Sequence, residues 1–225
     1  MKKIIMLLAC VLTVGILGGC TSDKDVSSYL QALLDTSYKN DTAAFVKMGL
    51  GTGEDARTLY EQGIDNGTEA FCGRLGVTDE FKEDFRTLYK DMLSKVRYEV
   101  GKAEKQSDGS YQVLVSYEKM NVFQPATAMY QEKVAELAKE WTEGDAPSEE
   151  EMMHQIVLTY KESLEAVLAE VQYNEPQTMT VRIELIDNVY ALAFPVLITT
   201  SMILSCDIWS PGAGWYLVLL KYVML

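Results

Sequence analysis

The sequence predicts an α+β fold, because the spacing of its apolar residues alternates between two patterns along the chain. Apolar residues recur at three- and four-residue steps over 26–38, and they alternate with polar residues over 96–100 and 111–117. The first pattern places apolar side chains on one face of a helix, and the second places them on one face of a strand. We therefore expect N-terminal helices, an antiparallel hairpin, two long helices and a further strand.

The N-terminal part is predicted to consist of several helices, the first of which ends at Asn-Asp-Thr over 40–42. A glycine-rich run over 49–53 separates short helices, and Asp-Asn-Gly-Thr over 65–68 is typical of a turn. Another helix follows Thr78. Its apolar residues are Phe81, Phe85, Leu88, Tyr89, Met92 and Leu93.

The alternating segments 96–100 and 111–117 are joined by Ser-Asp-Gly-Ser over 107–110, which is typical of a hairpin turn. Each strand has one polar side, so one face of the hairpin is expected to contact water. This hairpin is the tertiary feature that the sequence specifies best.

Two long helices are predicted after the hairpin. Pro125 suits the first turn of the first helix, and Ser148 with Glu151 forms a capping box at the start of the second. Asn-Glu-Pro over 174–176 ends the second helix, and alternation over 179–185 predicts the further strand.

The N-terminus has the features of a bacterial export signal. Lys2 and Lys3 precede an apolar run over 4–17, which is too short and ends too abruptly for an ordinary membrane-spanning helix. The run ends in Leu17-Gly18-Gly19-Cys20, which resembles the lipobox of bacterial lipoproteins, Leu-small-small-Cys. The alternative is an uncleaved signal anchor in which Cys20 has no role.

The lipobox resemblance implies cleavage between Gly19 and Cys20 and attachment of a diacylglyceryl group to the Cys20 thiol. Two acyl chains are enough for stable anchoring, so the chain is expected at the outer face of the bacterial cytoplasmic membrane. The expected organisation is a signal peptide over 1–19, a tether over 20–25 and an α+β domain over 26–187.

An anomalous apolar tail over 188–225 follows, in which the charged residues are Asp207 and Lys221 alone. Three explanations remain open. The tail contains a second membrane segment over 188–206, which is just long enough to span; it forms a pair of buried strands; or it is the product of a frameshift near Phe194.

Charge and cysteine content limit the partners further. The formal net charge is −13, and such an acidic chain does not attract nucleic acid, so no nucleic-acid partner is expected. Cys10 leaves with the signal peptide and Cys20 carries lipid, which leaves Cys72 and Cys206. The sequence leaves open whether Cys72 and Cys206 form a disulfide, but two cysteines do not make a framework of several disulfides.

No catalytic, cofactor-binding or metal-binding residue is assigned. Glu151 and His154 have the Glu-x-x-His spacing of helical di-metal sites, but such a site needs the motif twice, and this chain has one histidine. The glycines over 49–53 follow a helix and lack the Lys-Ser/Thr of a phosphate loop, which favours a helix connector.

Eight tyrosines could line a cleft, but their spacing favours core packing. They are Tyr29, Tyr60, Tyr89, Tyr98, Tyr111, Tyr117, Tyr130 and Tyr160.

Four segments carry a family resemblance: 29–41, 60–65, 85–90 and 96–100. They resemble small lipoproteins of Gram-positive gut bacteria, the DUF5105-like group. The resemblance covers roughly 20–187 and implies no known activity or functional residue. The order of helices followed by antiparallel strands is also similar to that of NTF2-like cone domains.

Two functions remain open from the sequence. The first is a non-catalytic binding or envelope-interaction module, whose partners are the membrane, through the lipid on Cys20, and an unknown surface ligand or protein. The second is an enzyme with an NTF2-like cavity that uses Asp or Glu beside Tyr for acid–base chemistry. A cavity lined by carboxylates with raised pKa would favour the enzyme.

Overall fold

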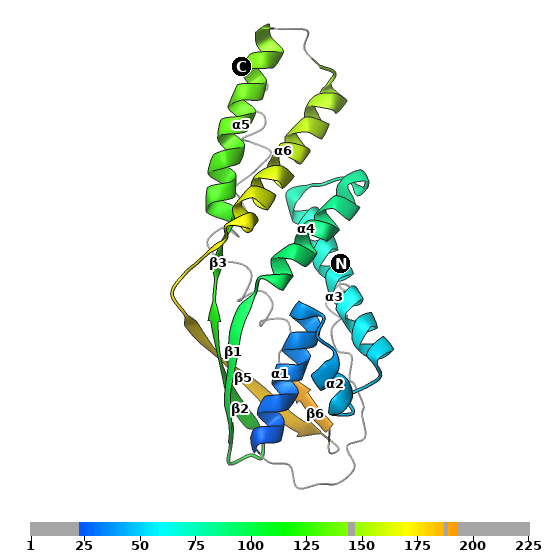
Figure 1. The fold of residues 1–225 in the computed structure, drawn as a ribbon, viewed down its shortest axis with the longest axis vertical. Coiled ribbons are helices and arrows are strands. Elements are labelled where there is room, and N and C mark those ends of the chain that lie inside the picture. The colour runs from blue at the N-terminus through cyan, green and yellow to red at the C-terminus, as the bar shows by residue number, and fades with distance from the viewer. Residues whose placement is uncertain (1–22, 144–146, 187–188, 193–225) are drawn as a thin grey trace. The chain divides into compact units, whose positions relative to one another are not determined.

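The computed structural model describes residues 23–143, 147–186 and 189–192, and these residues form an α+β fold (Figure 1). The predicted fold class is therefore confirmed. In chain order the elements are α1 (Asp23–Lys39), α2 (Ala43–Lys47), α3 (Gly53–Leu75), the 3₁₀ helix η1 (Asp79–Phe81), α4 (Lys82–Ser94), β1 (Arg97–Lys105), β2 (Tyr111–Glu118), β3 (Met120–Asn121), α5 (Phe123–Glu143), α6 (Glu149–Ala169), β4 (Gln172–Tyr173), β5 (Gln177–Ile186) and β6 (Val189–Leu192).

The described residues divide into two compact units. The sheet unit consists of 23–65, 93–119 and 175–192, apart from 187–188, and it contains α1, α2 and the four-stranded sheet. The helical unit consists of 66–92 and 120–174, apart from 144–146, and it contains α5, α6 and the short ladder of β3 with β4.

The sheet has the strand order β1-β2-β5-β6, and all neighbouring strands are antiparallel. The predicted hairpin is β1 with β2, in which Tyr98 lies opposite Tyr117. Its turn contains Gly109, whose φ of 85° lies in the left-handed region that glycine adopts without strain. Burial alternates residue by residue along most of β2, so the sheet has one buried face and one exposed face.

Helix α1 covers the buried face of the sheet (Figure 1). Val26 and Leu30 on this helix are fully buried. The Tyr29 hydroxyl donates a hydrogen bond of 2.9 Å to the Tyr190 carbonyl oxygen on β6, and the two rings lie 5.2 Å apart. Helix α1 therefore contacts both outer strands of the sheet, β1 and β6.

A β-bulge in β1 provides the contact between that strand and α1. The register shifts between Val100 and Ala103, so Gly101 and Lys102 together lie opposite Leu114. The Ser27 hydroxyl on α1 donates to the Gly101 carbonyl oxygen (2.9 Å) and accepts from the Ala103 amide (2.9 Å). One side chain of the helix thus satisfies two backbone groups beside the bulge. A Cβ at Gly101 would lie 2.8 Å from the Leu114 carbonyl oxygen, so the bulge has no room for a larger residue.

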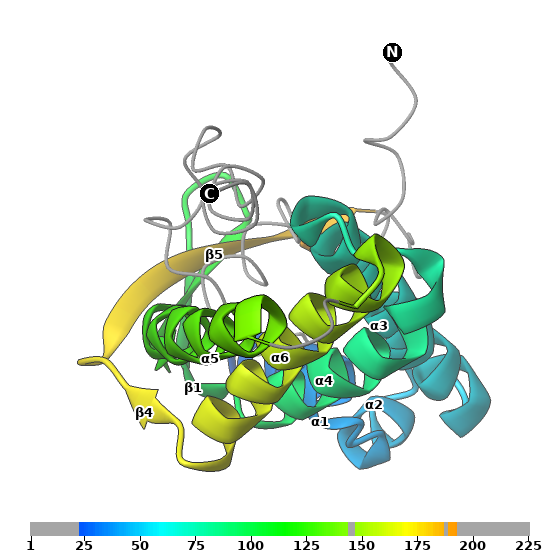
Figure 2. The ribbon, with the colours of Figure 1, turned by 90° about the horizontal axis from the view of Figure 1, so that it is seen from above.

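In the helical unit, α5 and α6 pack side by side as a helical hairpin (Figures 1 and 2). The rings of Tyr130 and Tyr160 meet edge to face between them, with centroids 5.4 Å apart. The predicted capping box is present: the Ser148 hydroxyl accepts from the Glu151 amide, and the Glu151 carboxylate accepts from the Ser148 amide. Among the described helices, none combines the length and the apolar character needed to cross a membrane.

An aromatic cluster joins three helices of the same unit. The Phe71 ring on α3 lies 5.9 Å from Phe85 and 6.3 Å from Tyr89, both on α4. It also meets Phe123 at the start of α5, at 6.2 Å. Phe71 on α3 therefore contacts aromatic residues of both α4 and α5.

The turn predicted over 65–68 is wrong, because these residues lie inside the continuous helix α3. Glycine in a helix interior costs about 1 kcal/mol relative to alanine. At Gly67 a packing contact accounts for the glycine, since a Cβ there would lie 2.3 Å from the Tyr89 ring. The absence of a side chain lets α4 approach α3 closely, and this tertiary contact overrides the local turn signal.

Three short strands, β3, β4 and β6, were not predicted individually. Strand β6 contains the first described residues of the apolar tail over 188–225, and it pairs with β5. The rest of the tail, the signal peptide over 1–19 and Cys20 lie outside the described residues. Residues 23–25 of the expected tether begin α1.

We predict that Gly67→Ala destabilises the protein by about 1–3 kcal/mol, because the new methyl group displaces the Tyr89 ring from a packed core. Gly63→Ala is the matched control, since Gly63 lies in the same helix with nothing within 4 Å of its Cβ position. The control should stabilise the protein by up to about 1 kcal/mol. Urea unfolding followed by circular dichroism measures both; equal effects of the two substitutions would contradict this packing account.

Candidate functional site

On its exposed side, the sheet presents a surface that no helix of the sheet unit covers among the described residues. We call it the outer face. It is defined by Glu99, Gln112, Leu114, Ser116, Thr178, Thr180, Arg182 and Glu184, which alternate with the buried residues of β1, β2 and β5. Leu114 is 51% exposed near its centre and lies opposite Thr180.

Ion pairs lie at both ends of the outer face and Glu99 lies on its β1 side, whereas the residues of β2 and β5 between the ends are uncharged. At one end Arg97 lies 3.1 Å from Glu118 across β1 and β2. At the other end Arg182 contacts two carboxylates, while Leu114 and the neighbouring threonines lie between these ends. An uncharged centre with a charged rim is the usual anatomy of a protein-binding surface.

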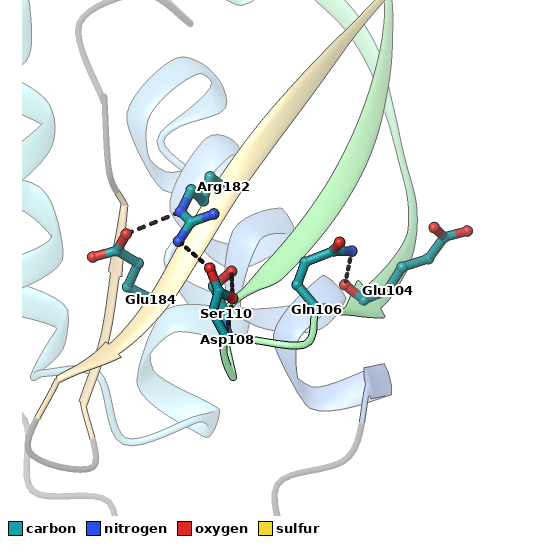
Figure 3. Close-up of polar contacts among 6 residues, drawn as sticks. All are labelled: Glu104, Gln106, Asp108, Ser110, Arg182 and Glu184. Carbon is teal, nitrogen blue, oxygen red and sulfur yellow. Dashed lines mark hydrogen bonds and ion pairs between the residues drawn. The ribbon is translucent and has the colours of Figure 1, made fainter.

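The arginine end of the outer face is drawn in Figure 3. Arg182 donates through Nη2 to Asp108 at 2.8 Å and through Nε to Glu184 at 2.9 Å. Asp108 also accepts from the Ser110 amide and hydroxyl, at 3.0 and 2.7 Å. Hydrogen bonds from Ser110 and Arg182 hold the pKa of the Asp108 carboxyl well below its ordinary value.

This arrangement fastens the hairpin turn to β5. Because the guanidinium group of Arg182 forms ion pairs with two carboxylates, its positive charge is compensated within the protein. The local sequence patterns do not predict this contact. The signal that could have found it is register: Arg182 lies opposite Gln112, two residues from the turn residue Ser110.

Asp35 and Tyr98 form a carboxylate–tyrosine pair in the sheet unit, and they are the candidates for the Asp-beside-Tyr chemistry. The Tyr98 hydroxyl on β1 donates to Asp35 Oδ1 on α1 at 2.6 Å. Lys39 Nζ lies 3.2 Å from the same oxygen and 4.3 Å from the centre of the Tyr98 ring. Gln31 donates to the other oxygen of Asp35 at 2.8 Å.

The electrostatics of this pair suit a structural contact better than proton transfer. Burial raises the pKa of Asp35, but hydrogen bonds from Tyr98, Gln31 and Lys39 outweigh burial and bring that pKa below its ordinary value. Burial and the bond to Asp35 raise the pKa of Tyr98. At neutral pH Asp35 is therefore ionised and Tyr98 protonated, whereas efficient acid–base groups have a pKa near the working pH.

The two residues of the Glu-x-x-His motif on α6, Glu151 and His154, make separate structural contacts. Glu151 caps its own helix, and hydrogen bonds from Ser148 lower its pKa. The His154 ring lies 4.7 Å from the Phe81 ring. The described residues contain no group of three His, Cys, Asp or Glu side chains that could hold a metal ion.

The glycine run over 49–53 connects α2 to α3, as predicted. Thr52 and Asp55 cap α3 reciprocally: the Thr52 hydroxyl accepts from the Asp55 amide, and the Asp55 carboxylate accepts from the Thr52 amide. The run therefore ends in a helix cap.

Core packing of the tyrosines is confirmed for seven of the eight, and Tyr98 is half-buried. The buried ones are Tyr29, Tyr60, Tyr89, Tyr111, Tyr117, Tyr130 and Tyr160. Burial raises the pKa of Tyr29, Tyr89 and Tyr130 to about 12.

Cys72 is a buried free thiol whose pKa is raised by burial, and Cys206 lies outside the described residues.

No protein-family model matches the chain, and no curated protein matches it. Among solved structures, its fold is similar to that of a "putative lipoprotein (ycdA)" from Bacillus subtilis. The TM-score is 0.53 at 15% sequence identity, and the match covers 82% of this chain. It covers 56% of the Bacillus protein, so the chain matches little more than half of that protein's length. At this identity the likeness shows a shared fold.

Proposed function

We propose that the protein is a lipid-anchored lipoprotein of the DUF5105-like kind that acts as a non-catalytic binding module outside the cytoplasm. The observation that carries the anchoring is the sequence Leu17-Gly18-Gly19-Cys20 after a short apolar run. The fold shared with a "putative lipoprotein" supports the same assignment. The diacylated Cys20 holds the domain at the outer face of the cytoplasmic membrane.

The outer face of the sheet supports the binding role. It joins the exposed Leu114 to uncharged polar residues of β2 and β5, with ion pairs at both ends, and β2 and β5 pair there in unbroken antiparallel register. A rigid surface loses little conformational entropy when it binds. We propose this face as the contact for a ligand or protein of the cell envelope.

The alternative, an acid–base enzyme, has Asp35 and Tyr98 as its best-placed pair. Such an enzyme would need a carboxylate with a raised pKa, and the pKa of Asp35 is lowered. The binding module is therefore the better supported function.

The lipid anchor is tested by Cys20→Ala in the full-length chain, expressed in a Gram-positive host that receives labelled palmitate. The wild type should carry label in the membrane fraction, and Cys20→Ala should carry none, because the acylated thiol is gone. Cys10→Ala is the matched control, since Cys10 precedes the cleavage site, and it should be labelled like the wild type. Label that persists in Cys20→Ala would contradict the proposal.

The binding role is tested by retention of labelled envelope fractions on the immobilised protein. Leu114→Glu should reduce retention by about tenfold, which corresponds to about 1.4 kcal/mol. Val46→Glu is the control, because Val46 is a comparably exposed apolar residue on α2, outside the outer face. No retention by the wild type, or equal loss in both variants, would count against binding at this face.

A further inference from the structure

The apolar face of α5 continues past the buried part of the helical hairpin. Tyr130 and Val134 on this face are buried. Leu137 and Trp141 follow at steps of three and four residues, which places all four side chains on one side of the helix. Leu137 and Trp141 are nevertheless partly exposed. The apolar face of α5 therefore becomes more exposed toward the end of the helix.

The same change occurs at the start of α6, which Figure 1 shows at the same end of the helical hairpin. Tyr160 and Ile156 are buried, whereas Met153 is 44% exposed. The rings of Tyr130 and Tyr160 meet between the two helices. Because a helix rises about 1.5 Å per residue, Leu137 and Met153 both lie about 10 Å beyond that contact.

We call Leu137, Trp141 and Met153 the apolar tip. Large apolar side chains that remain in contact with water at one end of a helix pair are typical of an interaction site. A flexible methionine side chain adapts to apolar surfaces of different shape, and tryptophan is enriched among the residues that dominate binding energy. The apolar tip therefore has the residue types of a surface that receives a partner.

Exposed carboxylates occupy the same turns of the two helices. They are Glu136, Glu140, Glu149, Glu150 and Glu151. The N-terminus of α6 favours the last three, because negative charge is stabilised there. Glu140 has no such reason, since it lies in the last turn of α5, where negative charge is unfavourable.

This charge selects among the partners that an apolar surface could bind. The basic residues over 135–142 and 147–155 are Lys139 and His154 alone. A second copy of this acidic chain and an anionic lipid surface would both be repelled by the glutamates, whereas a cationic partner would be attracted. The partner that fits is therefore both apolar and basic.

We propose that the apolar tip and the glutamates beside it bind a cationic amphipathic helix of another molecule. Apolar residues of that helix pack on Leu137, Trp141 and Met153, and its lysines or arginines pair with the glutamates. An amphipathic helix that lays its apolar face on a complementary surface is a common mode of peptide recognition. The surface belongs to the helical unit, so this inference does not depend on the outer face of the sheet.

The first test uses a labelled peptide of leucine and lysine, about 18 residues long, with its leucines on one face of the helix. Fluorescence anisotropy at about 0.15 M salt measures its binding to residues 20–225 carrying Cys20→Ser. We expect a Kd of about 10 µM or tighter. A peptide of the same composition with its leucines scattered around the helix should bind about tenfold more weakly or less. No binding of the first peptide, or equal binding of both, would overturn the proposal.

The apolar contact is tested by Met153→Glu, which should weaken binding of the amphipathic peptide by about tenfold or more. Val46→Glu is the matched control, because Val46 is also 44% exposed and lies on α2 in the sheet unit. This control should bind the peptide like the wild type. Equal loss in the two variants would refute the assignment to the apolar tip.

The charge contact is tested by Glu140→Gln with Glu150→Gln, which keeps the proposal falsifiable if Met153→Glu does not fold. This pair should weaken binding by about threefold or more. Glu54→Gln with Glu175→Gln is the control, because it removes the same charge from exposed positions of the sheet unit. Equal effects of the two pairs would mean a general attraction of the peptide to an acidic chain, and the proposal would be wrong.

Discussion

One hydroxyl group fixes the position of α1 on the sheet. Ser27 bridges the carbonyl oxygen of Gly101 and the amide of Ala103, on either side of the extra residue in β1. A buried backbone group without a partner costs about 1–3 kcal/mol, and the Ser27 hydroxyl supplies a partner to both of these groups. Helix α1 makes further polar contacts with the sheet, from Asp35 to the Tyr98 hydroxyl and from the Tyr29 hydroxyl to the Tyr190 carbonyl oxygen.

Local features of the fold could be predicted from the sequence, because their physical causes lie within a few residues. The capping box at Ser148 and the turn around Gly109 are of this kind. The bulge beside which Ser27 forms its hydrogen bonds could not be predicted, because the alternation over 96–100 gives no sign of an extra residue in the strand. The predicted turn around Gly67 failed because the reason for that glycine is the Tyr89 ring on another helix.

The candidate site divides in the same way. The resemblance of Leu17-Gly18-Gly19-Cys20 to a lipobox depends on neighbouring residues alone, so it can be noticed without a structure. The outer face and its ion pairs depend on strand register, which joins residues far apart in the sequence, such as Asp108 and Arg182. The Asp35–Tyr98 pair also depends on tertiary placement, and its lowered carboxylate pKa makes it a contact between α1 and β1.

The central claim is that Ser27 fastens α1 to the bulge, and amide exchange of Ala103 tests it most directly. Ser27→Ala should speed this exchange at least tenfold and lower the free energy of unfolding by about 1–3 kcal/mol. Ser28→Ala, at the exposed neighbouring position, should change either quantity little. Unchanged Ala103 exchange in Ser27→Ala, or equal effects of both substitutions, would contradict the account.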